Sequence, residues 1–354
     1  MNKKRVAVAL SGGVDSSTAA FLLKEAGYDV MGITMRLWPE EKPKPGKQHS
    51  PYPTTSNFQD AEQICRTLGI PFHVLDLEKE FKQHVIDYFC REYARGRTPN
   101  PCIACNRHIK FGSLLDHALS LDADYLATGH YARVEHYDDA YHLLKGIDPD
   151  KDQSYVLYTL GQDRLSRIFF PLGDYTKSQV RDLARQKGLP NASKPGSQDI
   201  CFIAADYGAF LSQYFTPTPG EIVNIKGEVL GKHRGTAFYT VGQRHGLGLA
   251  TAEPVYVTRI EPDKNRLTVG SKKELRAAGL IATEVSWASG KPPSEPMTVT
   301  VKIRYRSPDV AATVRPGLDS VEVSFHQAQT AIAPGQAVVF YRDSEVLGGG
   351  TIES

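Results

Sequence analysis

The sequence predicts an α/β protein, in which an N-terminal Rossmann-like parallel sheet is followed by two smaller β-rich domains, the last a β-barrel. Between Arg5 and about Leu211, short β-branched runs alternate with helical patterns, as in a parallel sheet with helical crossovers. After the turn-rich segment 216–220, short strands separated by Gly, Pro and Asp take over, which is typical of all-β domains. The expected domains are residues 1–214, 215–278 and 279–354.

The first domain should contain parallel strands whose crossovers are long enough for right-handed βαβ units. The expected strands are Val6–Leu10, Val30–Met35, Phe72–Leu75 and Tyr125–Thr128. The expected helices are Ser17–Ala26, Phe58–Leu68, Glu80–Tyr93, Phe111–Ser120 and Ser178–Lys187. An Asp-Asp turn between Tyr131–His136 and Tyr141–Lys145 predicts a hairpin.

The two β-rich domains are predicted from shorter runs, with a boundary near Arg276–Gly279. The central domain is expected to contain strands at Glu221–Ile225, Phe238–Val241, Val255–Ile260 and Arg266–Val269. The last is expected to contain about five, at Thr298–Tyr305, Ala312–Val314, Ser320–Phe325, Ala337–Tyr341 and Val346–Ile352. The proline-rich segment Trp38–Asn57 reads as a surface loop, which either closes over a ligand or is a plain flexible insertion.

Composition limits the classes of function. The 354 residues contain no apolar stretch near the roughly 20 that a membrane span needs and no signal-peptide core, so we expect a cytoplasmic protein without a membrane partner. Five cysteines are an odd number, which favours reactive or metal-binding thiols over a disulfide framework. Because the formal charge is only +2, any nucleic-acid binding must depend on local patches.

The strongest local signal is a loop between the first strand and the first helix. Its two glycines allow a tight turn, its serines offer hydroxyl donors, and the helix N-terminus that follows favours phosphate. The plain alternative is a Gly-Gly turn with a serine N-cap. The predicted phosphate-binding residues are Ala9, Leu10, Ser11, Gly12, Gly13, Val14, Asp15 and Ser16.

The run Ser11–Ser16 is similar to the signature of the PP-loop ATP pyrophosphatases, whose parallel sheet is of the HUP type. This resemblance implies cleavage of ATP between its α and β phosphates and adenylation of a carbonyl oxygen, with Mg²⁺ offsetting phosphate charge. The loop alone does not separate tRNA thiolases from ligases or amidotransferases that act on small molecules. A non-catalytic tRNA-binding or metal-binding protein is a further alternative, against which the intact loop argues.

Three further blocks, 98–111, 197–202 and 239–249, resemble the bacterial tRNA-specific 2-thiouridylases, and the resemblance extends to residues 334–336. It implies 2-thiolation of the wobble uridine, at position 34 of the tRNA, by adenylation of the 2-carbonyl and sulfur transfer from a cysteine persulfide. By the same resemblance Cys105 is the catalytic nucleophile and Cys201 carries the persulfide. A persulfide donor protein, either a cysteine desulfurase or a relay, is the implied partner beside tRNA.

The resemblance also implies binding residues outside the loop. Met35 should lie against adenine and Gly129 close to the nucleotide, at the carboxyl ends of strands, where open α/β sheets bind ligands. The residues implied to contact tRNA are Asn100, Pro101, Cys102, His130, Lys151, Asp152, Gln153, Arg304, Tyr305 and Gln336.

A basic stripe is predicted from the residues themselves. In Val301–Arg306 the cations Lys302, Arg304 and Arg306 alternate with apolar residues, so a strand would place all three on one face, suited to an RNA backbone. The plain alternative is a solvated edge that resists aggregation.

The remaining cysteines raise alternatives. Some relatives have Asp, with an assigned role as general base, where this chain has Cys102, whose role stays open. Cys102 and Cys105, with His108 and Cys201, could instead hold zinc or an iron–sulfur cluster, although with one CxxC motif we expect no metal. Cys65 and Cys90 are expected to be core thiols. The neighbours Arg107, His108 and Lys110 favour a lowered pKa for Cys105 if they point toward it.

Overall fold

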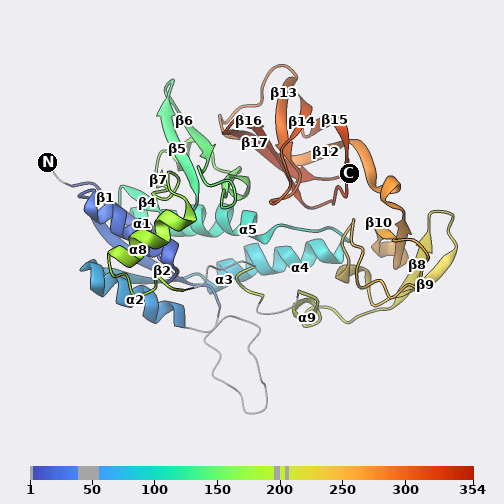
Figure 1. Ribbon diagram of the computed structural model, residues 1–354, viewed down its shortest axis with the longest axis horizontal. Helices are drawn as coiled ribbons and strands as arrows, with labels where there is room; N and C mark the ends of the chain where they lie inside the picture. Colours follow the sequence, from blue (N-terminus) through green and yellow to red (C-terminus); the bar gives the residue numbers. More distant parts are fainter. Residues whose placement is uncertain (1–2, 39–55, 195–199, 204–206) are drawn as a thin grey trace, which may run out of the picture.

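The computed structural model describes residues 3–38, 56–194, 200–203 and 207–354. An α/β part carries two β-rich parts, and long helices run between them (Figure 1). The predicted loop over Trp38–Asn57 lies almost entirely outside the described residues. Among those residues, no helix is long and apolar enough to cross a membrane.

The α/β part is built on a parallel sheet with the strand order β3-β2-β1-β4-β7. The predicted Rossmann-like sheet is therefore confirmed. Its fifth strand, β7, was not predicted, because two residues are too short to show a period. The strands are β1 (Arg5–Ala9), β2 (Asp29–Arg36), β3 (Phe72–Asp76), β4 (Tyr125–Ala127) and β7 (Ile168–Phe169).

Both faces of the central strands of this sheet are buried. Val6 and Val8 of β1 pack with Ile64, on the face covered by α1, α2 and α8, while Ala7 packs on the opposite face with Phe81. This alternation follows from the two-residue period of a strand, and it explains why β1 reads as a continuous apolar run. The helices are α1 (Val14–Glu25), α2 (Ser56–Leu68) and α8 (Lys177–Gln186).

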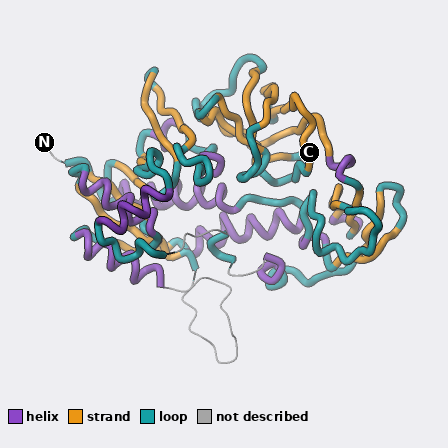
Figure 2. The backbone as a smooth tube through the Cα atoms, viewed as in Figure 1, coloured by secondary structure: helices purple, strands orange, loops and turns teal. Residues whose placement is uncertain are grey.

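Two long helical runs continue from the sheet toward the β-rich parts (Figure 2). The second begins at Pro101, not at Phe111 as predicted. Proline is favourable at the first position of a helix, and the Asn100 side chain caps the run by accepting a hydrogen bond from the Cys102 amide (3.1 Å). The first run is α3 (Glu78–Phe81), η1 (Lys82–Ile86) and α4 (Asp87–Ala94), and the second is α5 (Pro101–Ala104), η2 (Cys105–Leu114) and α6 (Leu115–Ser120).

The last domain is a closed antiparallel barrel of six strands in the order β12-β15-β14-β13-β16-β17, sealed by pairing of β12 with β17. The predicted barrel is confirmed, with one more strand than expected, because β12 occupies the stretch read as a boundary. Its interior is apolar and includes Val301, Val314 and Phe340. The strands are β12 (Arg276–Trp287), β13 (Met297–Lys302), β14 (Val310–Pro316), β15 (Val321–Thr330), β16 (Ala337–Arg342) and β17 (Glu345–Ile352).

The central part is a four-stranded sheet with the order β10-β11-β8-β9. The prediction of a strand at Phe238–Val241 is wrong, because the chain there forms a short helix whose last residue is the buried Phe238. Strand β9 was not predicted. The strands are β8 (Gly220–Asn224), β9 (Val229–His233), β10 (Tyr256–Glu261) and β11 (Arg266–Gly270). The short helices are η3 (Ser154–Leu157), α7 (Gln162–Leu165), α9 (Tyr207–Leu211), η4 (Thr236–Phe238), η5 (Pro262–Lys264) and η6 (Lys272–Leu275).

The predicted hairpin, β5 (Ala132–Tyr137) and β6 (Ala140–Lys145), joins the barrel sheet through β17. Leu144 pairs with Glu345, and the Lys145 amide donates to the Ser344 carbonyl (2.8 Å). The α/β part and the barrel thus share one continuous set of hydrogen-bonded strands.

Candidate active site

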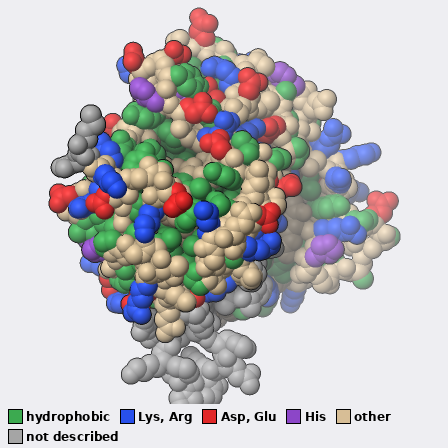
Figure 3. Space-filling view, turned by 60° about the vertical axis from the view of Figure 1, so that its left-hand side comes forward, with side chains coloured by type: hydrophobic (Ala, Val, Ile, Leu, Met, Phe, Trp, Pro, Cys, Tyr) green, Lys and Arg blue, Asp and Glu red, His purple; other side chains and the backbone are tan. Residues whose placement is uncertain are grey.

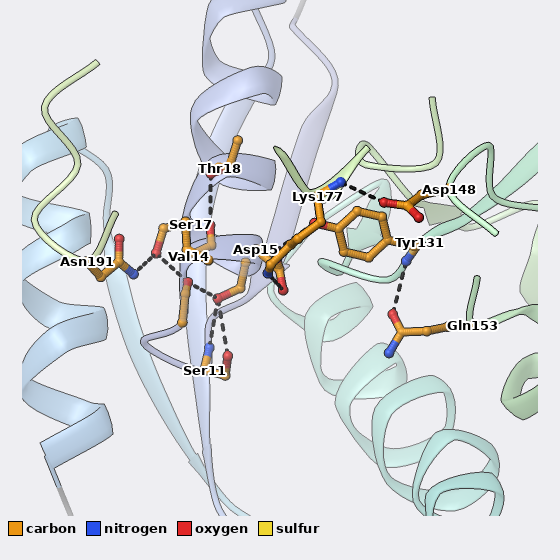
Figure 4. Close-up of polar contacts among 12 residues, drawn as sticks. Ser11, Val14, Asp15, Ser17, Thr18, Tyr131, Asp148, Gln153, Lys177 and Asn191 are labelled. Atoms are coloured by element: carbon orange, nitrogen blue, oxygen red, sulfur yellow. Dashed lines mark hydrogen bonds and ion pairs between the residues drawn. The ribbon is translucent and has the colours of Figure 1, made fainter. Parts of the chain in front are cut away.

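The predicted phosphate loop turns sharply between β1 and α1, with Gly12 at φ 72°, a conformation that favours glycine. The hydroxyl of Ser16 donates to the Gly13 carbonyl (3.2 Å) and accepts from the Ser11 amide (3.2 Å). From the far end of the domain, the amide of Asn191 donates to the Gly12 carbonyl (3.0 Å) and to Ser17 Oγ (2.7 Å), as Figure 4 shows in part. The loop is therefore held in shape before any ligand binds.

The N-terminus of α1 is open to an anion. Gly13 is its N-cap, with extended backbone, and none of the described side chains caps it. The plain reading of a serine N-cap is therefore wrong, because Ser16 and Ser17 turn their hydroxyls back onto the Gly13 carbonyl. The first amides of a 12-residue helix are thus left for a negatively charged ligand.

Asp15 lies at the centre of a polar network. Lys177, at the start of α8, donates to both carboxylate oxygens of Asp15 (2.5 and 2.7 Å), and the Tyr131 hydroxyl donates to one of them (2.8 Å; Figure 4). The Lys177 amide in turn donates to Asp148 (2.8 Å). Sequence reasoning missed Lys177, Tyr131 and Asn191, because no motif connects them with the loop.

Gly129 and Met35 lie at the carboxyl ends of β4 and β2, as predicted for their sequence positions. A Cβ atom on Gly129 would stand 2.8 Å from the Ser16 amide nitrogen, so only glycine permits this close approach of the two chain segments. Met35 is half-buried beside Leu75 of β3. Gly129 therefore borders the phosphate loop at Asp15 and Ser16.

Three cysteines gather near the start of the second helical run. Cys105 is buried (7% exposed), whereas Cys102 and Cys201 are exposed. Cys201 is anchored by Phe202, whose ring packs against those of Phe81 (5.8 Å) and Phe89 (5.5 Å). The prediction that Cys65 and Cys90 are core thiols is confirmed, since both are buried.

The pKa of Cys105 is raised to about 11, because burial disfavours the thiolate more than Lys110 stabilises it. The pKa of Cys201 is also raised, because the surrounding protein partly desolvates the thiolate even though the side chain reaches solvent, and because the thiols of Cys105 and Cys102 are near. Of the three basic neighbours, Lys110 does lower the pKa of Cys105, but burial raises this pKa by more, so the expected net lowering is not found. Arg107 and His108 are exposed, and neither is among the groups that shift the pKa of Cys105.

This raised pKa predicts how the thiol reacts. Only the thiolate is alkylated, so the rate of alkylation of Cys105 should rise about tenfold per pH unit from pH 7 to pH 10. It should level off near pH 11, where the thiol is largely ionised. Iodoacetamide labelling of the Cys102→Ser/Cys201→Ser protein, followed by peptide mass spectrometry, measures this rate. A plateau below pH 8 would contradict the structure and restore the expectation of a lowered pKa.

His130 is buried and in contact with Lys110. Lys110 Nζ lies 3.3 Å from His130 Nε2, and Thr128 Oγ1 lies 2.6 Å from Nδ1. Because an ammonium group only donates, Nε2 accepts and Nδ1 carries the proton that is donated to Thr128. Burial first, and then Lys110, hold the pKa of His130 well below its usual value, so the imidazole is neutral.

Half of the predicted tRNA residues have side chains that are hydrogen-bonded within the protein, namely Asn100, His130, Asp152, Gln153 and Gln336. Asp152 accepts from the Gly146 and Ser154 amides (both 3.1 Å), Gln153 accepts from the Tyr131 amide (3.0 Å), and Gln336 donates to the Thr98 carbonyl (2.8 Å). Of the others, Cys102, Lys151 and Arg304 are exposed, Tyr305 is half-buried and Pro101 is buried.

The prediction that one strand places Lys302, Arg304 and Arg306 on the same face is wrong. Strand β13 ends at Lys302, and Arg304–Ser307 form a turn closed by a hydrogen bond from the Ser307 amide to the Arg304 carbonyl (3.0 Å). The alternation of the cations therefore does not place them on one strand face. On the face drawn in Figure 3, Lys and Arg side chains lie among Asp and Glu and form no continuous basic field.

A metal centre was the other interpretation of the cysteines. Within the described residues, no group of three or more His, Cys, Asp or Glu side chains is arranged to hold a metal ion.

Comparison with known proteins connects this geometry to a family. The family model described as tRNA methyl transferase HUP domain matches residues 4–205. The tRNA methyl transferase PRC-barrel domain matches 208–271, and the aminomethyltransferase beta-barrel domain matches 277–352.

Full-length relatives share about half of their residues with this chain. The tRNA-specific 2-thiouridylase MnmA of Carboxydothermus hydrogenoformans is 49% identical, with 100% of this chain and 98% of the relative covered. The protein of that name from Moorella thermoacetica is 48% identical, with 98% and 99% covered. The chain belongs to the tRNA-specific 2-thiouridylase family. This membership confirms the resemblance seen in the sequence.

Proposed function

We propose that this chain is an ATP-dependent tRNA sulfurtransferase, which replaces the 2-oxygen of the wobble uridine with sulfur. One observation carries the proposal: an exposed thiol, Cys201, lies near enough to a buried one, Cys105, for the two to interact electrostatically, in a chain whose parallel sheet carries a phosphate loop. The names of the relatives support tRNA as the substrate. We place the reaction in the cytoplasm.

ATP is proposed to bind with its phosphates at the N-terminus of α1. The uncapped amides there and the close approach of Gly129 to Ser16 fit a nucleotide, and Lys177 supplies a cation beside them. Met35 and Gly129 would border the adenosine, and the Asp15 carboxylate would hold Mg²⁺, which offsets phosphate charge. The uridine 2-oxygen then attacks the α-phosphorus and pyrophosphate leaves, so that AMP activates the base.

Sulfur transfer is proposed to use the two thiols in different roles. The outer sulfur of a persulfide on Cys201 attacks the activated carbon and AMP leaves. The Cys105 thiolate attacks the inner sulfur, the persulfide bond breaks toward the base, and a Cys105–Cys201 disulfide remains. Because burial raises the pKa of Cys105, ionisation has to accompany substrate binding, and Lys110 is the cation in place to favour it.

The target base would be flipped out of its stack to reach these thiols. The proposed tRNA contacts are those named from the sequence, with Arg304 and Lys151 exposed to phosphates and His130 near the base through its partner Lys110. A cysteine desulfurase or a persulfide relay protein would load Cys201, whose exposure permits the encounter.

The direct test combines the protein with ATP, Mg²⁺, a persulfide source and unmodified tRNA. Thiolated tRNA, retarded in a mercury-containing gel, should appear together with AMP. AMP formation without any retarded tRNA would overturn the proposed function.

Charge reversal at Arg304 should weaken tRNA binding and lower the slope of log affinity against log salt by about one, because one phosphate contact is lost. Binding is measured by filter retention between low and moderate salt. Arg315→Glu, at another exposed arginine of the barrel, is the matched control and should change the slope less. Equal slopes for wild type and Arg304→Glu would remove Arg304 from the tRNA interface.

A further inference from the structure

Cys102 takes no part in the bond-making steps of the proposed reaction, although it is the more accessible of the two thiols on the helix that carries Cys105. It lies in the first turn of α5, exposed, and its amide is fixed by the Asn100 side chain. Cys105 follows one turn later and is buried. The pair therefore has an exposed first thiol and a shielded second one.

The geometry of this pair permits a disulfide. The backbone remains helical through Cys105 (φ −62°, ψ −45°). Residues three apart in a helix have Cα atoms about 5 Å apart, from the helical rise and radius. Disulfides span Cα distances of about 4.4–6.8 Å. A Cys102–Cys105 bond needs only side-chain rotation and a small backbone adjustment.

Cys201 belongs to the same cluster of thiols. Its neighbour Phe202 packs on Phe81 and Phe89, in the hydrophobic core that also contains Cys105. Both Cys105 and Cys102 act electrostatically on Cys201, so the exposed thiol lies in the neighbourhood of the helix that carries the pair.

We propose that Cys102 is a resolving thiol, which moves the disulfide left by each turnover from Cys105–Cys201 to Cys102–Cys105. The inference rests on the proposed function. The Cys102 thiolate attacks Cys105 Sγ, the Cys105–Cys201 bond breaks, and Cys201 leaves as a thiolate that takes up the proton lost by Cys102. No net oxidation or reduction occurs in this exchange. An external thiol then reduces the new disulfide by attack at the exposed Cys102 sulfur.

This exchange separates two tasks that would otherwise compete at Cys201. Once released, Cys201 can accept the next persulfide while the oxidised pair waits for reductant. Cys105 is too shielded for direct attack by an external thiol, whereas Cys102 is accessible.

The test maps disulfides after a single turnover without reductant, by acid quench, alkylation and peptide mass spectrometry. Wild type should contain mainly Cys102–Cys105 with alkylated Cys201, and Cys102→Ser should contain only Cys105–Cys201. The multiple-turnover rate of each variant is divided by its own single-turnover rate. If Cys102 also contacts the base, its loss slows both rates alike, and this effect cancels in the ratio. This ratio should fall several-fold for Cys102→Ser at low thiol and recover at high thiol, whereas Cys90→Ser, which removes a core thiol, should match wild type.

A wild type that contains only Cys105–Cys201 while thiolated tRNA forms would overturn the inference and leave the proposed function intact. Absence of thiolated tRNA from wild type would overturn the proposed function itself. A measurement without turnover keeps the inference testable in that case. In a glutathione redox buffer the oxidised protein should form Cys102–Cys105, and exclusive formation of Cys105–Cys201 would contradict it.

Discussion

Replacing Cys201 with Ser should abolish sulfur loading and lower tRNA thiolation by on the order of 10³-fold or more, because no other residue is proposed to carry the persulfide. Cys105→Ser should still accept sulfur on the exposed Cys201 but fail to complete transfer, with a comparable loss of product. Loading is measured with a radioactive sulfur donor, and thiolation by retardation in a mercury-containing gel.

Cys65→Ser serves as the control, since its buried thiol lies in the core between the sheet and its helices. It should load and transfer sulfur like wild type, once its stability is shown to be adequate. If Cys102→Ser, Cys105→Ser and Cys201→Ser each released a stoichiometric metal equally, the persulfide roles would be wrong and a metal-centred reaction would replace them.

Asp15→Ala should lower AMP formation by about 100-fold or more and leave tRNA binding nearly unchanged. The carboxylate pairs with Lys177 beside the open helix N-terminus, so its loss removes the proposed Mg²⁺ ligand and releases the lysine from its position. Ser16→Ala should act in the same direction, because its hydroxyl fixes the loop through Ser11 and Gly13. AMP release from labelled ATP and filter binding of tRNA measure the two quantities.

Asp182→Ala is the matched control, because Asp182 lies on the same helix as Lys177 and pairs with Arg185 at the surface. It should change neither quantity. A parallel loss of tRNA binding and AMP formation in Asp15→Ala would mean that the loop has been assigned to the wrong ligand.

Local pattern was sufficient for most of the fold. The central strands of the parallel sheet are apolar on both faces, and a glycine follows helices α1, α2 and α8, so local pattern located these elements. It failed where tertiary packing decides the conformation. Phe238 has the apolar character of a strand residue, yet it fills the core as part of a single helical turn.

The expected helix Phe111–Ser120 starts too late, because proline is compatible with the first turn of a helix and Asn100 supplies a cap before Pro101. The boundary matters for chemistry, since the earlier start makes Cys102 and Cys105 neighbours one helical turn apart. A side chain also fixes the backbone at the predicted stripe, where the Arg304 amide donates a hydrogen bond to the Ser307 hydroxyl (3.3 Å) and supports the turn that follows strand β13.

The motifs located the phosphate loop but not the residues that hold it. Lys177, Tyr131 and Asn191 come from separate segments and reach Asp15, Gly12 or Ser17 only through the fold. The raised pKa of Cys105 could not be predicted from the sequence either. It depends mainly on how completely the helices bury the thiol, and less on which cations are adjacent in the chain.

The pairing of β6 with β17 limits how the chain can be divided into fragments. A fragment that ends before Arg276 would uncover the outer edge of β6 and leave unpaired backbone groups, a template for aggregation. It would also strip Lys145 of the Tyr341 ring, 4.3 Å away, and of its partner Asp309 (2.5 Å). The ATP-binding part is therefore a poor candidate for isolation by truncation, and proteolysis should sooner release the central sheet's loops than separate the barrel.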